Sequence, residues 1–90
     1  MCGIFGISGS HQGIDLTQIN DLLNHRGPDD FGIYSNEFIS LLHRRLSILD
    51  LSELGHQPMF SKCGHLVIVF NGEIYNHWEI RNELLGKYEF

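Results

Sequence analysis

The chain has 90 residues, of which 42% are hydrophobic and 19% are charged. This length allows one small domain with a limited core. The net charge of −5, counted with neutral histidines, disfavours nucleic acid and anionic membranes as partners, because both reward clustered Lys and Arg. No apolar run is long enough to span a membrane, and the first residues lack the pattern of a secretory signal, so we expect a cytoplasmic protein.

Cysteine and histidine usage does not indicate a metal centre. Cys2 and Cys63 are too few for a disulfide framework, and in a reducing compartment both are expected to be free thiols. The six histidines do not form an H-E-x-x-H motif, and the chain has no C-x-x-C motif. We therefore expect no metal site; a zinc or redox module built on the two cysteines is a minor alternative.

The first third of the chain reads as a strand, a helix and a turn. Residues 3–8 predict a short buried strand whose two glycines allow close approach of another group. Asp15 or Thr17 can cap a helix with apolar residues at helical spacing, which should end near Asn24. Gly and Pro then make a turn of residues 25–30.

The remainder alternates strands with connectors and ends on a helix. Its expected elements are strands at 31–35 and 37–43, a continuation at 45–49, a connector at 50–57 closed by 58–60, a strand at 65–70, a helix from Asn76 to Leu85 stopped by Gly86, and the opening of another strand at 87–90. Strands and helices do not alternate regularly. This order favours an α+β fold over a doubly wound parallel sheet.

Cys2 is the candidate nucleophile. Removal of Met1 would leave a residue that carries both a thiol and a free α-amine. Their pKa values lie near about 8.5 and about 7.7–8.0, so the amine can exchange a proton with the thiol without a separate histidine base. The competing interpretation is a small buried residue that opens the first strand.

Two further segments carry candidate roles. Asn71 and Gly72 end an apolar strand, where a side-chain N–H and a backbone N–H can form an oxyanion hole; the alternative is an ordinary hairpin turn. Arg45 follows an apolar strand and could clamp a substrate carboxylate or form a structural salt bridge. Arg44 should point to the opposite face, so only one of these arginines can line a site.

Five motifs in register resemble the class II glutamine amidotransferases, specifically the glutaminase domain of glutamine-hydrolysing asparagine synthetases. The resemblance covers essentially the whole chain and rests on Met1-Cys2-Gly3-Ile4-x-Gly6, His25-Arg26-Gly27-Pro28-Asp29, Arg45-Leu46-Ser47-Ile48-x-Asp50, Gly55-His56-Gln57-Pro58-Met59 and Asn71-Gly72-Glu73-Ile74-Tyr75-Asn76. It implies an N-terminal-nucleophile fold, in which two stacked antiparallel sheets lie between helical layers. The chain would then be the N-terminal part, residues 1–90, of a type 2 amidotransferase domain.

The resemblance also implies roles for individual residues. Cys2 would attack the carboxamide of L-glutamine, and Asn71 and Gly72 would form the oxyanion hole. Arg45 would hold the glutamine α-carboxylate. The substrate pocket would further include Leu46, Ser47, Ile48, Leu49, Asn71, Gly72 and Glu73, and the turn that braces it would consist of Arg26, Gly27, Pro28 and Asp29.

Length is the departure from the family pattern. The family's glutaminase domain continues beyond residue 90 and is followed by a synthetase domain, in which ATP and magnesium are expected; this chain itself should hold no cofactor. The implied activity is ammonia supply for asparagine synthesis from aspartate, with the synthetase domain in the same protein or on a separate chain, and a homodimer is compatible with it. The alternative is a catalytically silent truncated fragment that serves only in binding or assembly.

Overall fold

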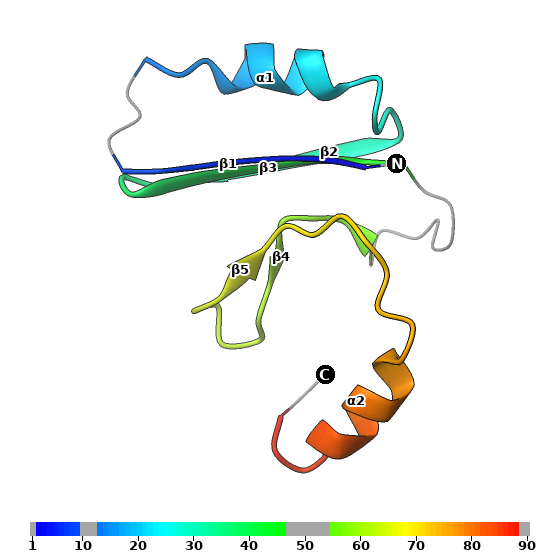
Figure 1. Cartoon of the computed structure of the whole chain (residues 1–90). Coiled ribbons are helices and arrows are strands. Elements are labelled where there is room, and N and C mark those ends of the chain that lie inside the picture. Colours follow the sequence, from blue (N-terminus) through cyan, green and yellow to red (C-terminus); the bar gives the residue numbers. More distant parts are fainter. Residues whose placement is uncertain (1, 10–12, 47–54, 89–90) are drawn as a thin grey trace.

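The structure, a computed structural model, describes residues 2–9, 13–46 and 55–88. Its elements are β1 (Gly3–Ser8), α1 (Leu16–Leu23), β2 (Asp30–Ser35), β3 (Ile39–Arg45), β4 (Met59–Phe60), β5 (Val67–Ile68) and α2 (His77–Leu84). Figure 1 shows α1 on one side of the β1–β3–β2 sheet, with β4, β5 and α2 on the other side. Antiparallel sheets combined with two described helices are compatible with the expected α+β class.

β3 is the central strand of the larger sheet. It pairs antiparallel with both β1 and β2, in a register that sets Gly3 opposite Arg44 and Asp30 opposite Arg45. The connection from β2 to β3 turns at Asn36, whose Oδ1 accepts hydrogen bonds from the backbone N–H groups of Phe38 (2.8 Å) and Ile39 (2.9 Å). This side-chain turn delays β3, so the strand begins two residues later than the sequence predicts.

The two arginines at the end of β3 point to opposite faces of the sheet, as the period of two predicts. Arg44 faces α1, where it binds Asn20 and Asn24. Arg45 faces the other side, where its guanidinium lies against Gly55. Arg44 therefore packs in the α1 layer, and Arg45 faces the layer that contains β4 and β5.

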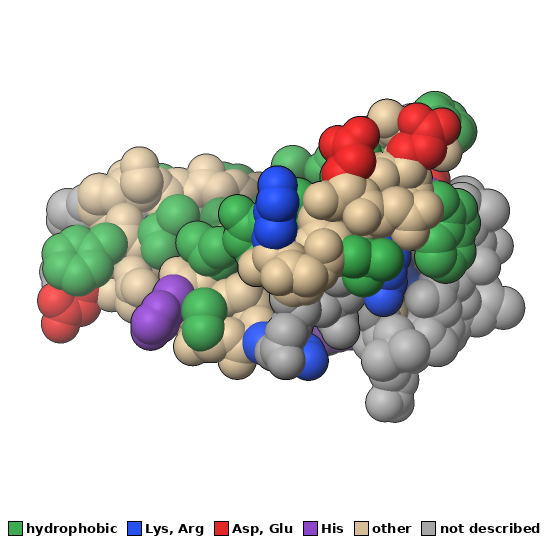
Figure 2. All heavy atoms as spheres, turned by 90° about the horizontal axis from the view of Figure 1, so that it is seen from below, with side chains coloured by type: hydrophobic (Ala, Val, Ile, Leu, Met, Phe, Trp, Pro, Cys, Tyr) green, Lys and Arg blue, Asp and Glu red, His purple; other side chains and the backbone are tan. Residues whose placement is uncertain are grey.

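The described core is centred on β3 and is largely polar. Leu42 and Ser40 are fully buried and His43 is 1% exposed, while Arg44 and Arg45 are each 7% exposed. Ser40 is satisfied by a 2.6 Å hydrogen bond between its hydroxyl and that of Ser35. Several large hydrophobic side chains are instead exposed, and Figure 2 shows hydrophobic groups on the face seen from below; the exposed set includes Leu66, Ile68, Phe70, Ile74 and Trp78.

Both predicted helices are confirmed. Asp15 is the N-cap of α1, because its Oδ1 accepts from the backbone N–H groups of Thr17 (3.0 Å) and Gln18 (3.2 Å). α2 begins after Asn76 and ends before Gly86, which adopts a φ of +86° that favours glycine. Within the described ranges, no helix is long and apolar enough to cross a membrane.

Strand predictions in the second half are less accurate. The expected strand at 65–70 reduces to β5, which pairs with β4 in a segment that the sequence assigns to a connector. The expected strand opening at 87–90 is wrong for its described residues, since the N–H groups of Lys87 and Tyr88 both donate to the Leu84 carbonyl, at 3.0 Å and 3.2 Å. β3 ends at Arg45, and the predicted continuation over 47–49 lies outside the described residues.

Candidate active site

Cys2 lies where the start of β1 meets the end of β3. The antiparallel register, which sets Gly3 opposite Arg44, places residue 2 beside the end of β3. The Cys2 Sγ accepts a hydrogen bond from the Leu46 backbone N–H at 3.3 Å, and its thiol can donate to the Leu46 carbonyl at 3.8 Å. Cys2 as a whole is half-buried, and Leu46 holds its sulfur through the backbone.

The backbone carbonyl of Cys2 is a meeting point for two distant side chains. The Arg26 Nε donates to it at 3.1 Å, and the Asn71 Nδ2 donates to it at the same distance from 69 positions along the chain. Gly72 follows in a tight position, since an added Cβ would lie 2.9 Å from the Phe70 ring. Glu73 is exposed, and the described residues make no polar contact with it.

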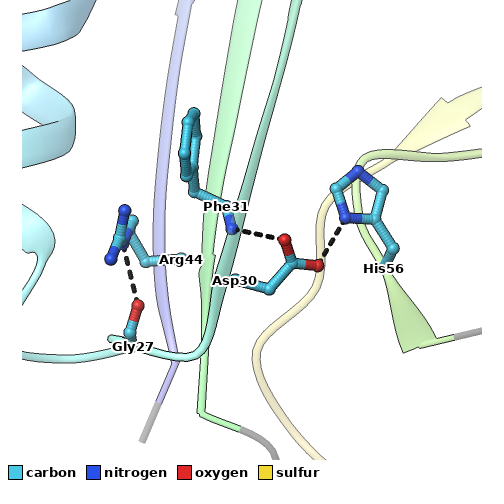
Figure 3. A network of polar contacts seen from close by, with 5 residues as sticks. All are labelled: Gly27, Asp30, Phe31, Arg44 and His56. Carbon is cyan, nitrogen blue, oxygen red and sulfur yellow. Dashed lines mark hydrogen bonds and ion pairs between the residues drawn. The ribbon is translucent and has the colours of Figure 1, made fainter. Parts of the chain in front are cut away.

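The turn before β2 packs directly on the end of β3. The Gly27 carbonyl accepts from the Arg44 Nε at 2.8 Å, which Figure 3 shows, and a Cβ on Gly27 would overlap the backbone of Arg44. The Asp29 N–H donates to the Arg45 carbonyl at 3.0 Å, and Pro28 forms a bridge with the same residue. The turn therefore contacts Cys2 through Arg26 and both β3 arginines through its backbone.

Arg45 lies in a polar cluster that the sequence does not reveal. Asp30 stands opposite Arg45 on β2, accepts from the Phe31 N–H at 2.8 Å and forms a 2.5 Å ion pair with the Nδ1 of His56 (Figure 3). Burial raises the pKa of Asp30, but the hydrogen bond and charge of His56, with the nearby charge of Arg45, outweigh it and leave that pKa below its ordinary value. Asp30 is thus ionised and bound to His56 beside Arg45.

Ser47, Ile48 and Leu49, which the sequence assigns to the substrate pocket, lie outside the described residues. The structure also brings Gln57 and His43 close to the candidate site. Gln57 belongs to the motif of residues 55–59, but no local pattern indicates its contact with Phe70, 13 positions away. His43 has no local sequence signal, because its neighbour Gly32 lies across the sheet.

His43 is a buried imidazole on the same sheet face as Arg45. It lies opposite Gly32 in β2, and in the part of the chain that the structure describes neither ring nitrogen has a hydrogen-bond partner. Burial lowers its pKa; the backbone of Phe70 and the charge of Asp30 oppose this, while His56 and Arg45 reinforce it. The ring is therefore neutral near pH 7.

We expect His43 to make the protein acid-sensitive below about pH 6.5. The unfolded chain takes up the proton first, so the free energy of unfolding should fall by up to about 1.4 kcal/mol per pH unit until the pH reaches the folded pKa. His43→Leu should flatten this slope in urea unfolding compared between about pH 7 and about pH 5. The exposed His65→Gln variant is the control; an unchanged slope in His43→Leu would contradict the assignment.

The described residues outside this site show no metal centre and one further thiol, that of Cys63. Among the described residues, no group of three or more His, Cys, Asp or Glu side chains could hold a metal ion. Cys63 is exposed, and its thiol pairs locally with the Ser61 hydroxyl at 3.3 Å, the main cause of a lowered thiol pKa.

Comparison with known proteins decides the family. The model of the glutamine amidotransferase domain matches residues 1–90. The chain belongs to the glutamine amidotransferase domain family. This amidotransferase domain is 42% identical to the glutamine-hydrolysing asparagine synthetase of Brassica oleracea over 93% of the chain, and 42% identical to asparagine synthetase 1 of Bacillus subtilis over 97%. It is 39% identical to asparagine synthetase B of Escherichia coli over the full length of the present chain.

These relatives are much longer proteins. The amidotransferase domain spans 15% of the Brassica and Bacillus proteins and 17% of the Escherichia protein. The similarity extends over nearly all of the 90 residues in each case, which confirms the family resemblance recognised from the motifs.

Proposed function

We propose that this amidotransferase domain hydrolyses the side-chain amide of L-glutamine with Cys2 as the nucleophile. The observation that supports it most is the hydrogen bond from the Asn71 side-chain amide to the Cys2 carbonyl, which joins residues 69 positions apart at the half-buried Cys2. A covalent cysteine mechanism needs a nucleophile, a nearby base and donors for the developing negative charge. Each of these has a candidate here.

The first step is attack by the sulfur. Once Met1 is removed, the α-amine of Cys2 accepts the thiol proton, and the thiolate forms a bond to the carboxamide carbon of glutamine. Collapse of the tetrahedral intermediate breaks the C–N bond, and the amine returns its proton to the leaving group, which departs as ammonia. Water then hydrolyses the γ-glutamyl thioester to glutamate and restores the thiol.

The oxyanion donors are the Asn71 side chain and the Gly72 backbone N–H. An asparagine amide carries two N–H donors, and one of them is occupied by the Cys2 carbonyl at 3.1 Å. The second can face the substrate. The single contact to Cys2 thereby sets the orientation of the donor relative to the residue that attacks.

Arg45 is the proposed clamp for the glutamine α-carboxylate, with Leu46 to Leu49 and Glu73 beside it as pocket residues. The guanidinium is largely buried, where a bidentate carboxylate contact is strong. The braced turn of residues 26–29 fixes the strand end that carries this arginine.

The domain would supply ammonia to a synthetase domain of a longer protein or of a separate chain. The relatives are named as glutamine-hydrolysing asparagine synthetases, which supports aspartate as the acceptor and ATP with magnesium as cofactors of that other domain. We further propose that the two described sheets belong to the αββα sandwich of the N-terminal-nucleophile fold. The antiparallel pairing and the position of α1 outside one sheet support this assignment.

A glutamine-like electrophile, 6-diazo-5-oxonorleucine, tests the proposal. It should label Cys2 and spare the exposed Cys63, as seen by mass spectrometry of digested protein, and excess glutamine should protect Cys2. Intact mass should show loss of Met1. Equal labelling of both thiols, or a retained Met1, would contradict the mechanism and favour a silent binding or assembly piece.

Arg45→Ala should raise the KM for glutamine about 100-fold, because one charge-assisted contact to a buried carboxylate is worth about 1.5–3 kcal/mol. The kcat for ammonia release should fall much less. Gln18→Ala, an exposed change on α1, serves as the control. An equal loss in kcat and KM would argue against a clamp.

A further inference from the structure

Gln57 connects the larger sheet to the segment after β5 that carries Asn71. We propose that Gln57 is a positioning residue for the Asn71 amide, an inference that rests on the proposed function and assigns a new residue to that same site. Three contacts lead to it: one from the Gln57 side chain, one from its backbone and one from the neighbouring His56.

The side-chain contact holds the chain just before Asn71. The Gln57 Oε1 accepts from the Phe70 backbone N–H at 2.6 Å. Strand pairing cannot do this, because β5 ends at Ile68 and its partner β4 is only two residues long. Among the described residues, Asn71 adds a hydrogen bond to the Cys2 carbonyl, and the His43 ring also lies near the Phe70 backbone.

The backbone of Gln57 is itself held against the larger sheet. Its carbonyl packs so closely over β2 that a Cβ on Gly32 would overlap it, and the Nε2 of His56 would lie 2.9 Å from the same Cβ. The Asp30–His56 ion pair anchors the preceding residue to β2 at 2.5 Å. Gln57 therefore reaches Phe70 from a fixed position.

The consequence for the reaction is geometric. Without an acceptor for its N–H, Phe70 loses its contact with residue 57, and the Asn71 amide depends on the Cys2 carbonyl alone. A donor displaced by about 1 Å stabilises the negative charge of the transition state much less, whereas ground-state binding of glutamine through Arg45 does not change. The effect should therefore appear in kcat and leave KM unchanged.

The test compares Gln57→Leu with Gln57→Glu. Leucine removes the acceptor at similar size, and glutamate keeps an oxygen that can accept from Phe70. We expect Gln57→Leu to lower the kcat for ammonia release about 10- to 100-fold at constant glutamine KM, and Gln57→Glu to retain most of it. Alkylation of Cys2 by iodoacetamide, which needs no oxyanion hole, should proceed at the same rate in both variants. The matched control is Gln18→Leu, an exposed glutamine on α1.

A second readout does not require activity. Hydrogen exchange of the Asn71 side-chain amide, followed by NMR, should be faster in Gln57→Leu than in the parent protein and in Gln57→Glu. Unchanged exchange and kcat in Gln57→Leu, or equal losses in both variants, would overturn the inference. A parent protein that releases no ammonia contradicts the proposed function instead, and the amide exchange then decides the inference by itself.

Discussion

Cys2→Ala should abolish ammonia release from glutamine. The substitution removes the atom that forms the covalent bond, and loss of a nucleophile from a cooperating set lowers kcat by a factor on the order of 10⁶ in well-studied enzymes. Coupled detection of ammonia should therefore give a rate at the background of uncatalysed hydrolysis. Cys2→Ser should also be much slower than the parent, because a hydroxyl is far less acidic than a thiol and is a weaker nucleophile at neutral pH.

The matched control is Cys63→Ala. Cys63 is exposed and pairs with Ser61, so its removal should leave both kcat and KM unchanged. Unfolding in urea should show that Cys2→Ala remains folded, since the sulfur contributes only two weak contacts, both with the Leu46 backbone. Residual activity in folded Cys2→Ala would refute a thioester mechanism.

Arg44→Ala should have the largest effect on stability. The Arg44 guanidinium donates to the Gly27 carbonyl, to Asn20 at 3.2 Å and to Asn24, and lies 5.3 Å from the centre of the Phe31 ring. Alanine leaves the buried Gly27 carbonyl without its donor, removes the hydrogen bonds to Asn20 and to the exposed Asn24, and opens a cavity on the α1 face of the sheet. We expect a loss of about 3–5 kcal/mol in the free energy of unfolding, because each hydrogen bond from a charged donor is worth about 1.5–3 kcal/mol, and this loss is a large part of the total for a small domain.

Arg44→Lys distinguishes the charge from the shape of the donor group. Lysine keeps the charge but cannot serve three acceptors with the planar fork of a guanidinium, so it should recover only part of the loss. Replacement of the exposed Arg81 by alanine should change stability by less than about 0.5 kcal/mol. A similar loss for Arg44→Ala and Arg81→Ala in urea titrations would show that the α1 face does not depend on Arg44.

Local sequence patterns predicted the elements whose determinants are local. The Asp15 cap, the helical spacing after it and Gly86 place both helices. Strand periodicity also separates Arg44 from Arg45. The strand at 65–70 was predicted too long because its apolar pattern continues to Phe70. In the structure the strand ends at Ile68, and the Phe70 N–H donates to the Gln57 side chain instead of to a neighbouring strand.

The family motifs single out Cys2, Arg26 and Asn71, which the structure brings into contact, but they do not indicate the other polar contacts nearby. The pairing of Asp30 with His56 joins residues 26 positions apart, and no spacing in the sequence relates them. The same is true of His43. Nothing in the sequence distinguishes it from the other histidines, whereas in the sheet it is buried opposite Gly32. Such contacts depend on which faces meet across two layers, which periodicity alone does not determine.

The contact between β2 and residues 56–58 is sensitive to any side chain at Gly32. Its hydrogen atom occupies a space in which a methyl group would strike the carbonyl of residue 57. A single added carbon at that point would force β2 and residues 56–58 apart, although it would touch no group proposed to contact glutamine. The packing of the two layers beside the candidate site thus requires glycine at position 32.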